Sequence, residues 1–197
     1  MRRFIKGLAT IFVGLLYRVK VQGLENIDNN RPYLLCANHT SIMDLLFIQV
    51  KLKRWVYWMA KKELFKNPLF GKFLEKLGAF PVERGKADLS ALRKALKILN
   101  EGHICGVFPE GTRQNQHVGE ELKPKSGAAF IAYKAGVNIL PVYITPNHRP
   151  FSTVHIVIGK PFAIEREKNH ENGNGAALKE NARYIMDRIY ALKENII

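Results

Sequence analysis

The sequence predicts a single α/β domain with a mixed, largely parallel central sheet flanked by helices and preceded by an amphipathic N-terminal helix. Three observations lead to this prediction. The 197 residues suit one domain, because a single core stops growing only beyond about 250–300 residues. Short apolar runs of strand length alternate with helical patterns along the chain. Hydrophobic residues make up 47% of the chain and charged residues 24%, which excludes a wholly disordered protein.

The predicted strands are short apolar runs, the kind that a largely parallel sheet buries on both faces. They lie at 33–37, 56–59, 79–82, 104–108, 139–144 and 154–158. Helical patterns between or after them lie at 87–100, 127–135 and 176–194. In sheets of this class, ligand sites lie in the loops that leave the carboxyl ends of the strands.

Residues 1–17 are predicted to form an amphipathic helix in front of the main domain, residues 18–197. The apolar stretch at 4–16 would rise only about 20 Å as a helix, short of the ~30 Å hydrocarbon core of a bilayer. A secretory signal is rejected because residues 17–20 offer no small-residue cleavage site. The pattern instead predicts a helix lying in a membrane interface. The alternative is a helix packed against the protein's own core.

The chain is strongly basic, with 31 Lys and Arg against 17 Asp and Glu and a net charge of +14. Such a charge predicts an anionic partner: nucleic acid, a phospholipid surface or a phosphorylated substrate. Lysines and aromatic residues also interleave over 51–76, a pattern typical of single-stranded nucleic-acid binding or of a membrane interface. The candidate membrane-binding residues are Arg2, Arg3, Phe4, Lys6, Phe12, Trp55 and Trp58.

The first polar motif is Asn-His-Thr-Ser-Ile-Met-Asp at 38–44, directly after a predicted strand. On a continuous helix His39 and Asp44 would lie on different faces, because five residues turn about 500°. They meet only if His39 lies in the loop and Asp44 in the first helical turn, with Ser41 as the N-cap. The carboxylate would then hold the imidazole tautomer, and the other ring nitrogen would face a substrate hydroxyl. The alternative is a capping-box-like helix start beside a polar loop histidine.

The second motif is Phe-Pro-Glu-Gly-Thr-Arg at 108–113, again just past an apolar strand. Gly111 allows close backbone approach, while Thr112, Arg113 and nearby amides suit a phosphate or an oxyanion. The alternative is a strand-to-loop turn with an exposed ion pair. The candidate residues for binding substrate and phosphate are Arg84, Glu110, Gly111, Thr112, Arg113 and Lys125.

Four blocks in order resemble the glycerolipid acyltransferase family, and within it the lysophosphatidate acyltransferases. They are the His39-X4-Asp44 pair, the segment 78–84, the segment 108–113 and the strand around Pro141. The Ala-Lys-Lys-Glu-Leu-Phe stretch at 60–65 also resembles what the family carries between its first two blocks. The resemblance covers roughly residues 18–162. Each block alone is weak evidence, but four in the right order within one small domain are specific.

The resemblance implies acyl transfer from a thioester, acyl-CoA or acyl-carrier protein, to the sn-2 hydroxyl of lysophosphatidate. His39 would be the general base and Asp44 its orienter, with no acyl-enzyme, and residues 18–197 would be the catalytic domain. Glycerol 3-phosphate, another lysophospholipid or a lyso-aminolipid would be accepted by the same blocks. The protein is expected to bind peripherally to an anionic membrane surface on its cytosolic face, the inner membrane of a bacterium.

Two other classes of function fit parts of the sequence. A nonenzymatic basic module acting through 51–76 would explain the charge but neither motif, so no nucleic-acid partner is expected. A covalent serine thioesterase or lipase would need a Gly-X-Ser-X-Gly elbow, which the sequence lacks. No phosphate loop or dinucleotide fingerprint occurs either, and the histidines show no metal-ligand spacing, so we expect neither a metal nor a cofactor. Cys36 and Cys105 resemble buried thiols of a reducing compartment.

Overall fold

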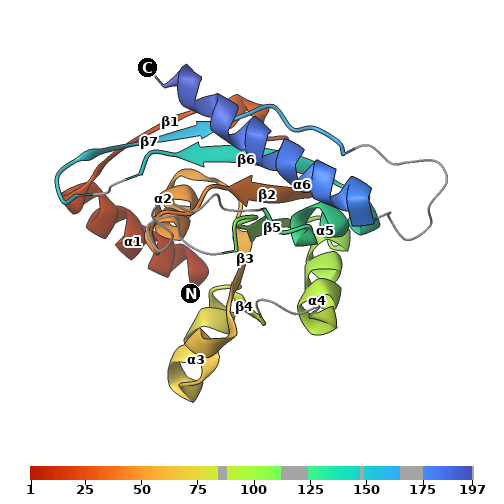
Figure 1. Ribbon diagram of the computed structural model, residues 1–197. Helices are drawn as coiled ribbons and strands as arrows, with labels where there is room; N and C mark the ends of the chain where they lie inside the picture. The colour runs from red at the N-terminus through yellow and green to blue at the C-terminus, as the bar shows by residue number, and fades with distance from the viewer. Residues whose placement is uncertain (84–87, 112–123, 147–148, 165–174, 197) are drawn as a thin grey trace.

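The computed structural model describes residues 1–83, 88–111, 124–146, 149–164 and 175–196. These residues form a seven-stranded sheet with helices on both faces (Figure 1). The strands are β1 (Arg18–Gln22), β2 (Tyr33–Ala37), β3 (Val56–Lys61), β4 (Phe80–Val82), β5 (Ile104–Val107), β6 (Asn138–Ile144) and β7 (Thr153–Ile158). The α-helices are α1 (Arg2–Leu16), α2 (Asp44–Lys51), α3 (Pro68–Lys76), α4 (Leu89–Asn100), α5 (Gly127–Ala135) and α6 (Gly175–Tyr190).

The strand order is β1-β7-β6-β2-β5-β3-β4. Neighbouring strands run parallel except β6 and β7, which are antiparallel. The predicted α/β class with a mixed, largely parallel sheet is therefore confirmed. The sequence does not predict β1, whose Val19 and Val21 alternate with polar residues at the edge of the sheet. Such a short, half-buried strand takes shape only when it pairs with its neighbour, here β7.

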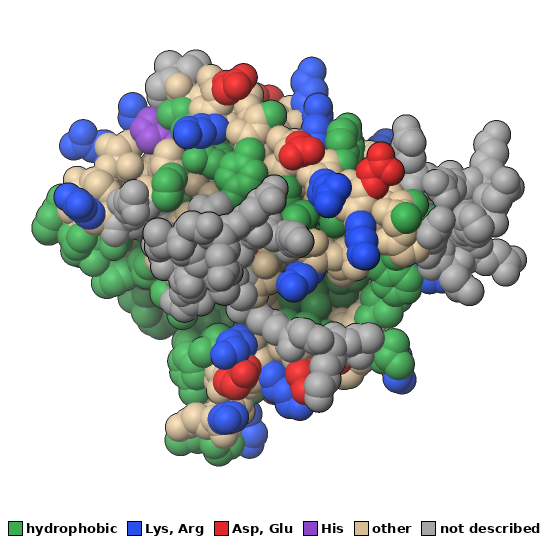
Figure 2. All heavy atoms as spheres, in the orientation of Figure 1, with side chains coloured by type: hydrophobic (Ala, Val, Ile, Leu, Met, Phe, Trp, Pro, Cys, Tyr) green, Lys and Arg blue, Asp and Glu red, His purple; other side chains and the backbone are tan. Residues whose placement is uncertain are grey.

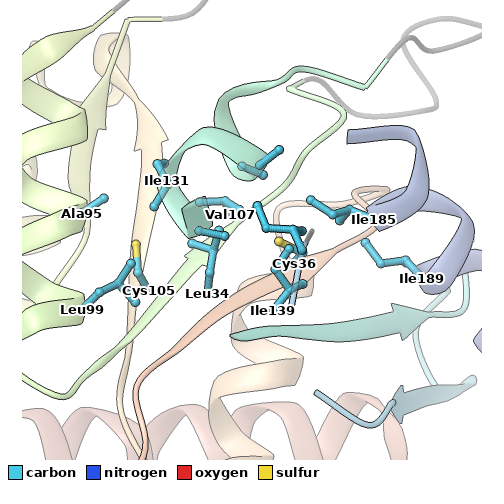
Figure 3. Packing of buried hydrophobic residues seen from close by; sticks show 14 of the residues in the cluster. Leu34, Cys36, Ala95, Leu99, Cys105, Val107, Ile131, Ile139, Ile185 and Ile189 are labelled. Carbon is cyan, nitrogen blue, oxygen red and sulfur yellow. The ribbon is translucent and has the colours of Figure 1, made fainter. Parts of the chain in front are cut away.

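The sheet is covered on its two faces by different helices. Leu34 and Cys36 of β2 belong to a core cluster with α4, α5 and α6, whereas Leu35 of the same strand belongs to a cluster with α1 and α2. This division follows from the period-two alternation of side chains along a strand. Figure 3 shows Ile185 and Ile189 of α6 beside Cys36 in the first cluster. α3 projects from the body beyond β3 and β4 (Figure 1).

Local signals explain where two of the helices begin or end. α4 begins after Asp88, whose carboxylate accepts hydrogen bonds from the backbone of Ser90 and Ala91 as an N-cap. α6 ends at Tyr190 and continues as a 3-10 helix over Ala191–Asn195, so the helix predicted at 176–194 divides in two. This end of α6 matters below because Tyr190 reaches the candidate site.

The two cysteines are free and buried in the core, as their apolar surroundings predict. Burial raises the pKa of the Cys105 thiol to about 12 and also raises the pKa of Cys36. Both thiols therefore stay protonated near neutral pH and pack as small apolar side chains.

Candidate active site

The carboxyl ends of β2 and β5 lie side by side at one edge of the sheet, because these strands pair in parallel. Cys36 near the end of β2 lies opposite Val107 at the end of β5, so the two strands end at the same level of the sheet. His39 follows the first strand and Glu110 follows the second. Two polar motifs about 71 residues apart in the sequence therefore meet in space.

His39 and Asp44 form a buried pair at this edge. Nδ1 of His39 lies 3.0 Å from a carboxylate oxygen of Asp44, and the two side chains are 7% and 0% exposed. Because a carboxylate only accepts hydrogen bonds, the proton of the neutral ring lies on Nδ1 and Nε2 is left as an acceptor. An oriented ring with one unprotonated nitrogen is what a general base requires.

The Asp44 carboxylate is itself held by the loop that carries His39. The backbone N–H groups of Thr40 and Ser41 both donate to Oδ2 of Asp44, each at 2.8 Å. Asp44 is also the first residue of α2, where the helix dipole stabilises a negative charge. The carboxylate thus closes the start of the helix and orients the histidine together, so the two interpretations of this motif are compatible.

The prediction that Ser41 is the N-cap of α2 is wrong. The helix begins after Met43, whose side chain makes no cap, and Ser41 Oγ instead accepts a hydrogen bond from the Met43 N–H at 3.2 Å. A turn separates the serine from the helix. Asp44 reaches back from the first helical turn and accepts the N–H groups of Thr40 and Ser41, as the acidic residue of a capping box does.

Phe108, directly after β5, stacks on the His39 ring, and Trp58 of β3 stacks on Phe108. The ring centroids of His39 and Phe108 are 3.9 Å apart with planes 15° from parallel, and Phe108 stacks on Trp58 at 5.1 Å and 12°. Trp58 of β3 lies over Gly106 of β5, where a Cβ atom would come within 2.4 Å of the indole ring. Gly106 therefore makes room for the stack, which restrains the histidine ring by packing.

Glu110 is buried at 3% exposure next to the His39 loop. One carboxylate oxygen accepts a hydrogen bond from the His39 backbone N–H at 3.4 Å, and the other accepts one from the Tyr190 hydroxyl at 2.6 Å. Burial and the neighbouring carboxylate raise the pKa of Tyr190 above its ordinary value, so the phenol stays a donor. The carboxylate is thus engaged by protein groups, and direct contact of Glu110 with a substrate stays a prediction.

Gly111 lies in the turn that follows Glu110, and Lys125 lies against it. Gly111 has a φ of 73°, in the left-handed region that favours glycine, and a Cβ there would come within 3.3 Å of Lys125 Cγ. The Lys125 N–H donates to the Pro109 carbonyl at 2.9 Å, which brings the lysine back to this turn. The other candidates for phosphate binding, which lie outside the described residues, are Arg84, Thr112 and Arg113.

The groups at this edge of the sheet suit proton transfer beside an anion. The imidazole of His39 has the chemistry of a general base, and the turn at Gly111, with Lys125 against it, has backbone N–H groups and a positive charge of the kind that bind anions. Among the described residues, no cluster of three His, Cys, Asp or Glu side chains is placed to hold a metal ion.

The acyltransferase family model matches residues 18–145, a range that contains both polar motifs and the strands that carry them. The chain belongs to the acyltransferase family. A 1-acyl-sn-glycerol-3-phosphate acyltransferase of Bacillus subtilis is 33% identical over 142 residues, which cover 72% of this chain and 69% of the relative. One of Streptococcus pneumoniae is 32% identical over 149 residues, covering 72% of this chain and 53% of that relative.

A solved structure of a family member has the same architecture. The 1-acyl-sn-glycerophosphate (LPA) acyltransferase of Thermotoga maritima is 29% identical and matches with a TM-score of 0.69, covering 98% of this chain and 81% of that one. The family resemblance predicted from the sequence is thereby confirmed. Some acyltransferase relatives are longer, since the chain spans about half the length of the S. pneumoniae protein.

The N-terminal helix of this acyltransferase both contacts the core and exposes an apolar face. Phe4 is 70% and Phe12 49% exposed, and Arg3 is exposed beside them. Val13, in contrast, is buried in the core cluster that includes α2. The remaining exposed apolar side chains of α1 are Leu8, Ile11 and Leu15.

Arg2 and Lys6, two further candidates for membrane binding, face the protein. Arg2 donates hydrogen bonds to the Tyr57 hydroxyl at 2.8 Å and to the Lys76 carbonyl at 3.0 Å. Lys6 Nζ donates to the Leu52 carbonyl, and partial burial lowers the pKa of this lysine. These two half-buried cations therefore hold α1 against the end of α2 and the end of α3, and their binding to a membrane stays a prediction.

Of the two tryptophans predicted to bind a membrane, Trp58 is buried and Trp55 is half-buried. Trp58 is 5% exposed in the stack below His39, and the Trp55 indole N–H donates to the Leu77 carbonyl at 2.7 Å. In the 51–76 segment, exposed apolar side chains gather on α3 instead. Figure 2 shows hydrophobic side chains over α1 and over α3. The most exposed ones on α3 are Leu69 (81%), Phe70 (48%) and Phe73 (44%).

Two residues that the sequence motifs did not predict also support the site. The Asn38 side chain accepts a hydrogen bond from the Ile144 N–H at 2.8 Å and donates one to its carbonyl at 2.9 Å, which ties the His39 loop to β6. A polar residue directly after a buried strand is a signal that could have identified it. Tyr190 lies about 80 residues from Glu110 in the sequence, and no local pattern connects the two.

Proposed function

We propose that this acyltransferase moves a fatty acyl chain from an acyl thioester to the sn-2 hydroxyl of lysophosphatidate, giving phosphatidate. The observation that carries the proposal is the buried His39–Asp44 pair, with Nδ1 3.0 Å from the carboxylate. The relatives from B. subtilis and S. pneumoniae, named 1-acyl-sn-glycerol-3-phosphate acyltransferases, support this acceptor. Acyl-CoA and acyl-carrier protein are the two donors that the chemistry allows.

The reaction needs one base and no covalent acyl-enzyme. Nε2 of His39 takes the proton of the sn-2 hydroxyl while the hydroxyl oxygen attacks the thioester carbonyl carbon. The tetrahedral intermediate collapses by breaking its carbon–sulfur bond, and the departing thiolate takes the proton back from the imidazolium. Asp44 stabilises that imidazolium through its hydrogen bond with Nδ1–H. The acceptor hydroxyl itself is the nucleophile throughout.

We assign the phosphate of the acceptor to the turn that contains Gly111. Glycine there lets the phosphate approach the backbone N–H groups, and Arg113 and Arg84 offer bidentate guanidinium contacts. Thr112 and Lys125 add a hydroxyl donor and a further positive charge. The net charge of +14 favours a phosphorylated acceptor and an anionic surface around it.

We also propose peripheral binding to the cytosolic face of a membrane, the inner membrane in a bacterium, through α1 and α3. The exposed side chains of Phe4, Phe12 and Leu69 would enter the interface, and Lys66 and Lys72 beside them suit anionic headgroups. α1 packs in the same core cluster as α2, the helix that begins with Asp44, so the catalytic pair lies on the membrane side of the sheet. No helix in the described part of the chain is long and apolar enough to cross a bilayer.

The experiment that tests the proposal measures thiol release from a long-chain acyl-CoA and from acyl-carrier protein, with and without lysophosphatidate on anionic vesicles. Release that requires lysophosphatidate, yields phosphatidate and disappears in His39→Ala supports the transferase and identifies its donor. Release without any acceptor contradicts the proposal and indicates a thioesterase. Release only with glycerol 3-phosphate or another lysolipid keeps the chemistry but replaces the acceptor.

A further inference from the structure

We infer that Tyr190 is a positioning residue for the proposed acyl transfer. Its hydroxyl holds Glu110, and Glu110 in turn holds the backbone of His39. The inference rests on the proposed function, because it concerns how the base of that reaction is placed. Tyr190 lies outside the 18–145 range that the family model matches, so the C-terminal helix of this chain supplies this part of the site.

The bond between Tyr190 and Glu110 is short and has an ionised acceptor. The phenolic oxygen lies 2.6 Å from the carboxylate, within the ~2.5–2.7 Å range of O–H···O⁻ bonds, which are stronger than neutral ones. Glu110 is 3% exposed, and a carboxylate buried so deeply is costly unless donors satisfy it. Its second oxygen accepts the weaker bond from the His39 N–H at 3.4 Å. Of these two bonds, the one from the tyrosine therefore holds the carboxylate more firmly.

Tyr190 reaches Glu110 from a firmly packed element. It is the last residue of α6, and Ile185 and Ile189 of the same helix are fully buried in the core (Figure 3). Tyr143 of β6 packs edge-on against the Tyr190 ring, with centroids 6.1 Å apart. The hydroxyl is thus presented by a rigid helix end.

The contact joins the two helical layers of the molecule across the edge of the sheet. α6 packs in one core cluster, whereas α2, which begins with Asp44, packs in the other. Glu110 lies between them and touches the backbone of His39 on one side and Tyr190 on the other. Asp44 orients the ring of the histidine from one layer, and Tyr190 holds its backbone from the other layer through Glu110.

Loss of the Tyr190 hydroxyl would affect the chemical step more than substrate binding. The buried carboxylate would lose the donor of its 2.6 Å hydrogen bond and shift toward its remaining partners, which displaces the His39 backbone. Small displacements of a general base lower the rate steeply because proton transfer depends on geometry. The turn at Gly111 is held separately by the hydrogen bond from Lys125 to Pro109. We therefore expect kcat to fall while KM for the acceptor changes little.

The test compares Tyr190→Phe with a matched control on the same helix. Tyr184→Phe removes a hydroxyl whose ring packs on Phe162 and which makes no hydrogen bond to any described residue. We expect Tyr190→Phe to lower kcat about tenfold, the effect of losing a hydrogen bond to a charged group, with KM within about twofold. Tyr184→Phe should match the wild type in both constants.

A double-mutant cycle with Glu110→Gln shows whether Tyr190 acts through Glu110. If it does, Tyr190→Phe on the Glu110→Gln background should cost much less than it costs in the wild type, because coupled residues are not additive. An equal loss on both backgrounds would overturn the inference. Phenylalanine keeps the shape of the ring, so a Tyr190→Phe protein that melts below the assay temperature would also overturn it, since the hydroxyl would then serve stability.

The outcome separates this inference from the proposed function. An active wild type whose Tyr190→Phe variant keeps full kcat overturns the role of Tyr190 and leaves acyl transfer intact. A wild type that shows no acyl transfer with any acceptor lipid overturns the proposed function itself and the inference with it.

Discussion

The edge of the sheet that carries His39 and the exposed face of α1 are built in opposite ways. At the edge, Asp44 and Glu110 are almost completely buried and accept hydrogen bonds from backbone and side-chain donors. On α1, Phe4 and Phe12 are large apolar side chains that are exposed to solvent. The first region holds a fixed geometry, which chemistry requires. The second leaves apolar area free, which only a partner outside the chain can bury.

This difference predicts that single changes at the edge affect catalysis or stability, whereas changes on the exposed face of α1 affect membrane binding alone. Replacement of the base should have the largest effect. We expect His39→Ala to lower the acyl-transfer rate by about 10²–10⁴-fold, the usual contribution of a general base. Asp44 keeps its two backbone donors in this variant, so the melting temperature should stay close to that of the wild type. Thiol release measures the rate, and full turnover would show that His39 is not the base.

Asp44→Ala should reduce both activity and stability. Alanine removes Oδ2, the one oxygen that accepts hydrogen bonds from the Thr40 and Ser41 N–H groups and from Nδ1–H of His39. We expect a rate loss of about 10²-fold or more and a loss of about 1–3 kcal/mol in the free energy of unfolding, because buried donors are left unpaired. Thiol release measures the rate and urea unfolding measures the stability. Ser41→Ala is the control, and an Asp44→Ala protein as stable as the wild type would contradict the geometry.

The exposed face of α1 should tolerate polar residues without loss of stability. Phe4→Ser combined with Phe12→Ser removes apolar area that would enter the membrane, and each fully buried phenylalanine contributes roughly 1.5–3 kcal/mol. Binding to anionic vesicles, measured by sedimentation, should therefore fall by about tenfold or more, with the melting temperature unchanged. Adding Leu69→Ser on α3 should weaken binding further.

Val13→Ala is the matched control on the same helix. Val13 is 2% exposed and packs in the core, so the smaller side chain should lower the melting temperature and leave vesicle binding by the folded protein unchanged. If the two phenylalanine changes lowered the melting temperature and Val13→Ala did not, the assignment of the two faces of α1 would be reversed.

The contribution of Tyr190 to the melting temperature at alkaline pH should be the smallest of these effects. Burial and Glu110 raise the pKa of Tyr190 in the folded protein above the value of about 10 for a free phenol. The hydroxyl of Tyr190 therefore contributes stability that is fully present below pH ~10. This stability is lost as the pH rises toward the pKa that Tyr190 has in the folded protein. Tyr190→Phe should therefore flatten the fall in melting temperature above pH ~10 relative to the wild type. Equal slopes for the variant and the wild type would contradict a phenol bonded to a buried carboxylate.

Local patterns were reliable where a segment is buried on both faces or carries its own end signals. The prediction of 33–37 agrees with β2, and the prediction of 127–135 agrees with α5, which ends at Gly136 in the left-handed conformation. The pair His39 and Asp44 was also predicted, because a strand end followed by a helix start leaves few positions for each residue. The short edge strand β1 and the exposed helix α3 were not, since their residues are only half buried or mostly in solvent.

The sequence by itself determined the α/β class, most of the strands and the loop in which the candidate base lies, because these depend on apolar runs and on contacts between residues close in the chain. Only the tertiary structure decided that Arg2, Lys6 and the two tryptophans face the protein. It also decided that Tyr190 completes the surroundings of Glu110. Periodicity defines the faces of a helix relative to its own axis. Which face meets a neighbour, and which distant side chain reaches a buried carboxylate, depends on how whole elements pack.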